Sequence, residues 1–302
     1  MDFALSADQQ AVVDAVGTIL ARQAGADRAR ALGPAGHDDA LLDAFDNGGF
    51  LDVWRDDTVG ALGAVLLAQA ASRHHARANL AVRVVVAPAL LDGELPRRVA
   101  VTSRASRGPV RYGQFADTVL ILDGDEAVVA AVAASRAVDS PYGFPYAYVD
   151  TTGERRLGPG SGARLEAWWR VAVAAEISGA LDGAVAHTAA HLSDRRQFGR
   201  PLGGLQALQH RLAEAHVWAE GTRWLTRRAA FDGASPATAA AAAAYATQAA
   251  QLIGADTHQL SGAIGFTTEF DLHLWTTRLH GLRVELGGTT AHQVATAVAT
   301  WG

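Results

Sequence analysis

The sequence predicts a mostly α-helical protein in which a small β domain separates an N-terminal helical domain from a C-terminal bundle of four or five helices. Apolar residues recur at helical spacing before residue 97 and again after residue 163. The segment between them alternates apolar and polar residues, as strands do, and a Gly-rich run at 158–162 follows it. We therefore expect a helical domain at 1–96, a β domain at 97–157 and a helical bundle at 158–302.

The N-terminal domain opens on a helix start signal. Ser6 and Gln9 form a capping-box pattern, in which the Ser6 hydroxyl accepts from the Gln9 amide and the Gln9 side chain reaches back. Further helices are expected from Leu62 and at 87–91, where Pro88 is tolerated only near a helix start.

The β domain is predicted from short alternating runs. Residues 118–122 and 127–132 flank Asp123-Gly124-Asp125, which is typical of a hairpin turn. Residues 98–102 predict one more strand, and 146–149 are expected to close the sheet. We interpret the Gly-rich run after it as a linker.

The last part of the chain predicts a bundle of long helices. In the first, three apolar residues and one threonine share a face, and the Thr188 hydroxyl can bond back to the carbonyl of Ala184. Ser235-Pro236 is a helix cap followed by Pro at the first helical position, and it starts an Ala-rich helix. The remaining helices are expected to begin near residues 205, 271 and 290.

Composition excludes several classes of function. Of the 302 residues, 26 are Lys or Arg and 31 are Asp or Glu, which argues against a non-specific nucleic-acid binder. Cysteine is absent, which excludes disulfides, Fe–S clusters and thiolate zinc sites. Residues 1–5 lack a signal-peptide pattern, and we find no run suited to a membrane span. We expect a cytoplasmic protein, and we interpret His187 and His191 as packing residues rather than metal ligands.

The first candidate site lies in the run 194–202. Arg195 and Arg196 stand together at a helix end, followed by Gln197, Phe198 and a turn at Gly199. The planar fork of an arginine can donate two hydrogen bonds to one phosphate, so the pattern suits a diphosphate. The alternative is a basic helix end that satisfies its own last carbonyls.

A second run follows about sixty residues later. Gln259 precedes Gly262 and Gly265 in a turn after the Ala-rich helix. Glycine lets the backbone approach a phosphate closely and adopt a positive φ. The alternative is an ordinary corner between two helices, in which glycine is only the cap.

Together, in this order and spacing, the two runs resemble the C-terminal helical domain of the acyl-CoA dehydrogenases, which bind FAD. The resemblance implies that Arg195 and Gln197 bind the FAD diphosphate of a neighbouring subunit, and that Phe198 packs beside the cofactor. It also implies that Gln259 and the backbone amides around Gly262 meet the same diphosphate across the subunit interface.

The resemblance also implies a carboxylate that removes the α-proton of an acyl-CoA. In most of the family this Glu lies about 27 residues after the motif Gln, a count that reaches Leu286, one residue past Glu285. One residue turns a helical side chain by about 100°, so Glu285 is the candidate base if the turn is rearranged. The alternative is a solvated carboxylate. The family's other base position holds Trp169.

The middle domain is shorter than in typical members and lacks a convincing Thr-Glu-Pro-type loop, for which residues 102–104 are the nearest match. We therefore expect this chain not to hold the isoalloxazine ring by itself. In these respects it is similar to the short subunit of actinobacterial α2β2 acyl-CoA dehydrogenases of steroid degradation.

That resemblance implies an enzyme subunit that oxidises an acyl-CoA to the α,β-unsaturated thioester. Its FAD site would be shared with a second acyl-CoA dehydrogenase-like chain in a heterotetramer. That partner would supply the base if Glu285 does not. The alternative is a non-catalytic structural or flavin-free subunit that uses the helical fold for assembly or binding.

Overall fold

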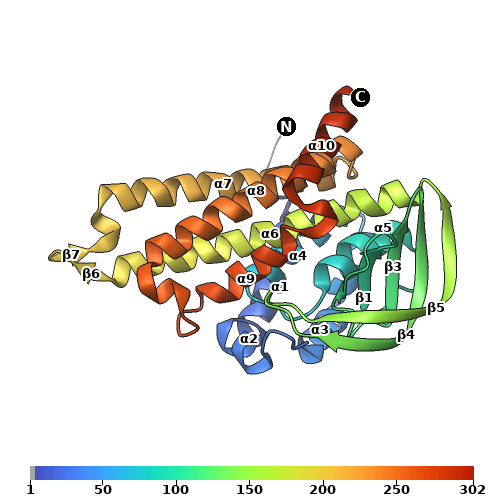
Figure 1. Ribbon diagram of the computed structural model, residues 1–302, viewed down its shortest axis with the longest axis horizontal. Coiled ribbons are helices and arrows are strands. Elements are labelled where there is room, and N and C mark those ends of the chain that lie inside the picture. Colours follow the sequence, from blue (N-terminus) through green and yellow to red (C-terminus); the bar gives the residue numbers. More distant parts are fainter. Residues whose placement is uncertain (1–3) are drawn as a thin grey trace.

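The computed structural model describes residues 4–302, in which a five-stranded sheet stands beside a bundle of long helices (Figure 1). The start of the segment used for the signal-peptide expectation, residues 1–3, lies outside the described residues. The predicted fold class is confirmed, because helices precede and follow a small sheet in the predicted order. Among the described residues, no helix is long and apolar enough to cross a membrane.

The N-terminal domain consists of helices around a shared core. Ser6 caps α1 as predicted: its side chain accepts from the Gln9 amide at 3.1 Å, and its own amide donates to the Gln9 side chain at 3.0 Å. Pro88 lies in the first turn of the short helix α5, the position that was expected for it. The elements are α1 (Ala7–Gln23), α2 (Ala26–Leu32), α3 (Asp39–Asn47), η1 (Phe50–Arg55), α4 (Gly60–Arg73), η2 (Val82–Val86) and α5 (Ala87–Leu90).

The sheet has the order β1-β3-β4-β5-β2. The predicted hairpin is confirmed: β3 pairs antiparallel with β4, Asp123 opposite Glu126, around a turn with Gly124 at φ 64°. β1 runs parallel to β3, and β2 pairs with β5. The strands are β1 (Val99–Ser103), β2 (Val110–Arg111), β3 (Thr118–Asp123), β4 (Glu126–Val138) and β5 (Tyr146–Pro159).

The interpretation of residues 158–162 as a linker is wrong. Strand β5 continues to Pro159, and the first bundle helix starts at Ser161, so the two elements are joined at Gly160. Gly160 adopts a φ of 78°, which glycine reaches without a steric cost. The Ser161 hydroxyl accepts from the amide of Ala127 on β4 at 2.8 Å, which fixes the helix start against the sheet.

The bundle is built on α6, which crosses the molecule beside α7 and α8 (Figure 1). Its 34 residues correspond to a length of about 50 Å. Thr188 bonds back to the carbonyl of Ala184 at 2.8 Å, as predicted, and Ser235 caps α8. The elements are α6 (Ser161–Asp194), β6 (Arg196–Gln197), β7 (Arg200–Pro201), η3 (Leu202–Gly204), α7 (Gln206–Phe231), α8 (Pro236–Ser261), η4 (Gly262–Phe266), α9 (Leu272–Leu282), η5 (Glu285–Gly287) and α10 (Gly288–Trp301).

The N-terminal domain and the bundle meet most closely where α4 crosses α6 at Gly179. A Cβ added there would stand 2.0 Å from the carbonyl oxygen of Gln69 on α4. We expect Gly179→Ala to destabilise the fold by about 1–3 kcal/mol or more, because backbone must move apart. Gly254→Ala on α8 is the control, since no atom lies within 4 Å of its added Cβ. Urea unfolding measures the stability of both variants. Equal unfolding midpoints for the two variants would contradict the close contact at Gly179.

Candidate active site and cofactor-binding surface

A cavity of about 710 Å³ opens between the sheet and the bundle, within the size range of small-molecule sites. Its walls come from the β1–β2 region, from residues 138–146 and from α6. Its floor is formed by the segment that joins α9 to α10. Aromatic and aliphatic side chains line much of it, and Glu285 and Arg111 are among its charged residues.

Glu285 reaches this cavity through an unusual turn. It begins η5, and the next residue, Leu286, adopts φ 53° and ψ 30°. A left-handed conformation at a branched residue costs free energy, and such strain is frequent at functional sites. The turn before α10 thus departs from regular helical geometry. The side chain of Glu285 is only 12% exposed.

Glu285 belongs to a buried network of three charged groups. Arg111 on β2 donates from Nε to Glu285 at 2.6 Å, and from its two Nη atoms to both oxygens of Glu176 on α6, at 2.9 and 2.8 Å. Trp169 on α6 donates from its indole to the second oxygen of Glu285 at 2.7 Å. Phe144 lies under the guanidinium, 4.8 Å from it.

The network changes the protonation of its members. Burial raises the pKa of Glu285, and the charge of Glu176 raises it further, whereas Arg111 and the indole of Trp169 lower it; the net shift is upward. Burial alone would lower the pKa of Arg111, but the two carboxylates outweigh it and the pKa is raised. Glu285 is thus a carboxyl of this site for which burial outweighs the ion pair with Arg111 and favours proton uptake.

The two base positions considered from the sequence meet at this point, since Trp169 and Glu285 are hydrogen-bonded. Trp168, the neighbour of Trp169 on α6, packs edge-on against Trp54, with ring centroids 4.5 Å apart. Sequence reasoning missed Arg111 and the role of Glu176. A signal existed for Glu176, because it follows Trp169 by seven residues, two helical turns on the same face.

The first FAD-motif residues lie on an exposed hairpin at the far end of α6 (Figure 1). Arg195 ends the helix, and Gln197 pairs with Arg200 across the hairpin. Phe198 and Gly199 form its tip with φ 52° and 77°, the two positive values of a tight hairpin turn. The Phe198 ring is 84% exposed. A strained, solvated aromatic residue indicates a surface that contacts something outside this chain.

The second motif lies at the same end of the bundle, where α8 ends (Figure 1). Gln259 is exposed, and Gly262 caps the helix with φ 69°. The local role of Gly262 as a cap is therefore real. The Gly262 amide donates to the carbonyls of Gln259 and His258. No other part of the chain lies within 4 Å of the place where a Cβ would stand, so a ligand can approach the backbone closely at this turn. Beside it, Phe266 is 75% exposed and stacks on His258.

The cavity and this exposed end are far apart in one chain. Trp169, which contacts Glu285, lies 25 residues before Asp194 on one continuous helix, a separation of about 38 Å. One dinucleotide cannot contact both regions of the same chain. The structure thus separates Glu285 from Arg195, Gln197, Phe198, Gln259 and Gly262, and brings the latter five to one end.

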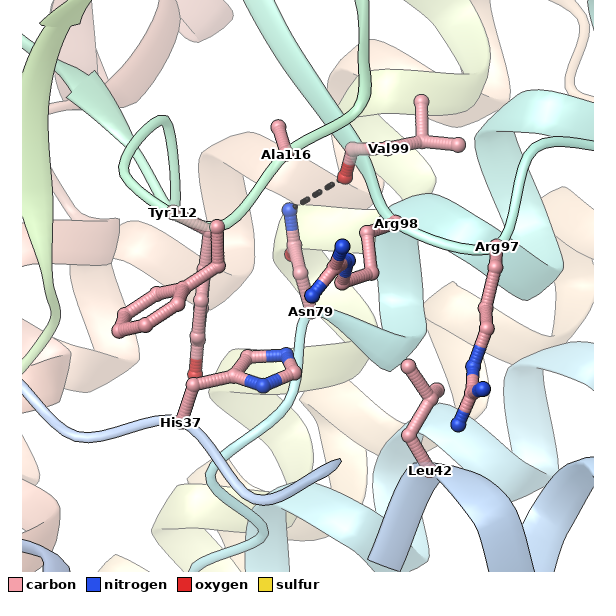
Figure 2. A pocket seen from close by; sticks show the side chains of 9 residues that line it. His37, Leu42, Asn79, Arg97, Arg98, Val99, Tyr112 and Ala116 are labelled. Carbon is pink, nitrogen blue, oxygen red and sulfur yellow. Dashed lines mark hydrogen bonds between the residues drawn. The ribbon is translucent and has the colours of Figure 1, made fainter. Parts of the chain in front are cut away.

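Two other candidates have structural explanations. His187 and His191 pack against the ring of Phe270, with ring centroids 4.4 and 5.0 Å apart. A small hollow beside His37 and Asn79 (Figure 2) has a volume of about 10 Å³, room for roughly one water molecule. In it, Asn79 donates to the carbonyl of Val99 at 2.9 Å.

Residues 166–300 match the family described as acyl-CoA dehydrogenase, C-terminal domain. With the fold described above, this match and the relatives below make the chain similar to the acyl-CoA dehydrogenases. It is 29% identical over 296 residues to the acyl-CoA dehydrogenase IpdE2 of Mycobacterium tuberculosis, an alignment that covers 91% of each protein.

Solved structures share the fold over nearly the whole chain. The likeness to a chain of the ChsE4-ChsE5 complex from Mycobacterium tuberculosis has a TM-score of 0.83 at 22% identity and covers 100% of both chains. The likeness to the Tcur3481-Tcur3483 steroid ACAD has a TM-score of 0.78 at 21% identity, and it covers 97% of both chains.

Proposed function

We propose that the chain is a subunit of an FAD-dependent acyl-CoA dehydrogenase that works as a heterotetramer with a second acyl-CoA dehydrogenase-like chain. The complex oxidises an acyl-CoA, with a steroid-derived acyl group as the first candidate, to the α,β-unsaturated thioester. The likeness to the Tcur3481-Tcur3483 steroid ACAD supports the steroid candidate, and the likeness to a chain of the ChsE4-ChsE5 complex supports the partner.

The observation that carries the shared site is the separation of about 38 Å between the cavity and the exposed end of the bundle. Arg195 and Gln197 would hold the FAD diphosphate from one chain, and Gln259 and backbone amides near Gly262 would complete the contact. The partner chain would hold the isoalloxazine ring. When bound, FAD supplies the acceptor for the hydride that leaves the β-carbon of the substrate.

Within this chain, Glu285 is the residue suited to proton removal. Its side chain lines the cavity and is itself largely buried, and its raised pKa favours acceptance of the substrate's α-proton. Arg111 and Trp169 each donate to a different oxygen of the carboxylate and hold it in place, and each oxygen keeps further lone pairs for that proton.

A non-catalytic subunit is the second candidate, and one observation favours it. Both oxygens of Glu285 already accept a hydrogen bond, one of them from a guanidinium, as in a purely structural ion pair. In that case the base belongs to the partner, and this chain contributes assembly surfaces. The exposed stripe of Val294, Val298 and Trp301 on α10 is suited to such contacts.

A visible absorbance spectrum with native mass tests the proposal, first on the chain alone and then on the chain co-expressed with a candidate partner from the same organism. We expect flavin bands only in a four-chain complex. Flavin bound by the chain alone would contradict the shared site, and a four-chain complex without flavin would leave the structural candidate.

A further inference from the structure

We propose that Glu176 is a positioning residue for Glu285. By engaging both Nη atoms of Arg111, it fixes the guanidinium against Glu285 and leaves one buried cation facing two carboxylates. This inference rests on the proposed role of Glu285 as the base, and it concerns how that role is tuned.

The geometry distinguishes the two carboxylates. Glu176 receives the bidentate, fork-to-fork pairing that is the stronger arrangement for an arginine, whereas Glu285 receives only the single bond from Nε. The side chains of Arg111, Glu176 and Glu285 are 6%, 7% and 12% exposed, so water screens their charges poorly. Glu176 is therefore the main counter-ion of Arg111, and Glu285 shares the same positive charge through a single hydrogen bond.

A proton on Glu285 makes the network neutral. With Glu176 and Glu285 both ionised, the three groups carry a net charge of −1 in a buried site, which is unfavourable. Transfer of one proton from the α-carbon of a substrate to Glu285 removes that charge. Glu176 thus keeps Glu285 ready to accept a proton, although Glu176 does not touch the substrate.

The other groups around Glu285 leave this balance intact. Tyr146 from β5 is a phenol whose pKa is raised by burial, so it remains neutral. Trp169 from α6 donates without a charge. On α10, burial and the charge of Arg170 lower the pKa of His292 to about 4, so this imidazole is neutral near pH 7. Arg170 itself is paired with Glu166.

The experiment compares Glu176→Gln with the wild-type complex in the pH dependence of kcat/KM. The glutamine keeps an acceptor for Arg111 but removes the charge, so Arg111 then favours ionised Glu285. We expect the acid limb to move to lower pH by about 1–3 units. Asp182→Asn, which removes another paired carboxylate of α6, at Arg223, is expected to leave the limb in place.

Glu176→Asp keeps the negative charge and serves as a second variant in case the glutamine variant does not fold. The acid limb of the pH profile of Glu176→Asp is expected to stay near the wild-type position. A second readout does not depend on activity. The infrared carbonyl band of the protonated Glu285 carboxylic acid is measured as a function of pH. The band is assigned to Glu285 because it is absent in Glu285→Gln. A merely structural Glu176 would lower stability without moving either titration.

The two readouts separate the inference from the proposed function. If the band and the acid limb both move in Glu176→Gln, the inference holds. If the band moves and the limb does not, Glu176 controls the protonation of Glu285, but Glu285 is not the base, and the positioning role in catalysis is overturned. If the band stays in place, the charge coupling itself is refuted.

Discussion

Replacing Glu285 by Gln is expected to lower kcat of the assembled enzyme by about 10²–10⁴-fold, the usual contribution of a general base. The substitution preserves the size of the side chain and one acceptor oxygen, but it removes the carboxylate that we propose as the acceptor of the α-proton. KM is expected to change little, because the cavity walls stay as they are. Steady-state kinetics of the purified complex with an acyl-CoA substrate measures both constants.

Glu220→Gln provides a matched control. Glu220 also accepts from an arginine and a tryptophan, Arg223 and Trp224, but it lies on α7 and outside the cavity. A general loss of buried carboxylate pairing would affect both variants, whereas loss of the base affects only Glu285→Gln. Wild-type kcat in Glu285→Gln would show that the partner chain supplies the base.

The pH dependence of the wild-type enzyme follows from the same site. Because burial and Glu176 raise the pKa of Glu285, activity that requires its ionised form is expected to fall at a higher pH than for an ordinary glutamate. The folded protein also binds this proton more tightly than the unfolded chain. The ionised carboxylate therefore reduces stability as pH rises through the folded-state pKa.

Local patterns were enough to predict much of the fold. The capping box at Ser6, the Ser235-Pro236 helix start and the Asp123–Asp125 turn each act within a few residues, so the sequence displays the whole interaction. The linker interpretation failed because glycine near 158–162 marks a positive φ at the end of a strand as readily as a flexible segment.

The site was less predictable because its contacts span the chain. Arg111 lies 65 residues from Glu176 and 174 from Glu285, and only the tertiary fold brings them together. A count from Gln259 also assumes helical geometry, and the left-handed Leu286 breaks that assumption. Motif residues on an exposed hairpin, in contrast, keep their sequence spacing in space, so their grouping could be expected.

The double variant Arg195→Ala, Gln259→Ala is expected to lower the flavin affinity of the complex by about 100-fold or more. A hydrogen bond between a charged group and a phosphate contributes about 1.5–3 kcal/mol, and two such contacts are removed. Both side chains are exposed at the end of the bundle, so the fold does not depend on them. Flavin absorbance per chain after gel filtration, with native mass on the same fractions, measures cofactor and assembly together.

Arg164→Ala, Gln251→Ala is the matched control, because it removes an exposed arginine and an exposed glutamine from the same two helices, α6 and α8. Arg164 lies in the first turn of α6, about 45 Å along the helix from Arg195. If the site is shared, only the Arg195→Ala, Gln259→Ala variant loses flavin, and its four-chain complex stays intact. Full flavin content in the Arg195, Gln259 variant would mean that the exposed end has kept the motif without its ligand, and the non-catalytic subunit would then be the better description.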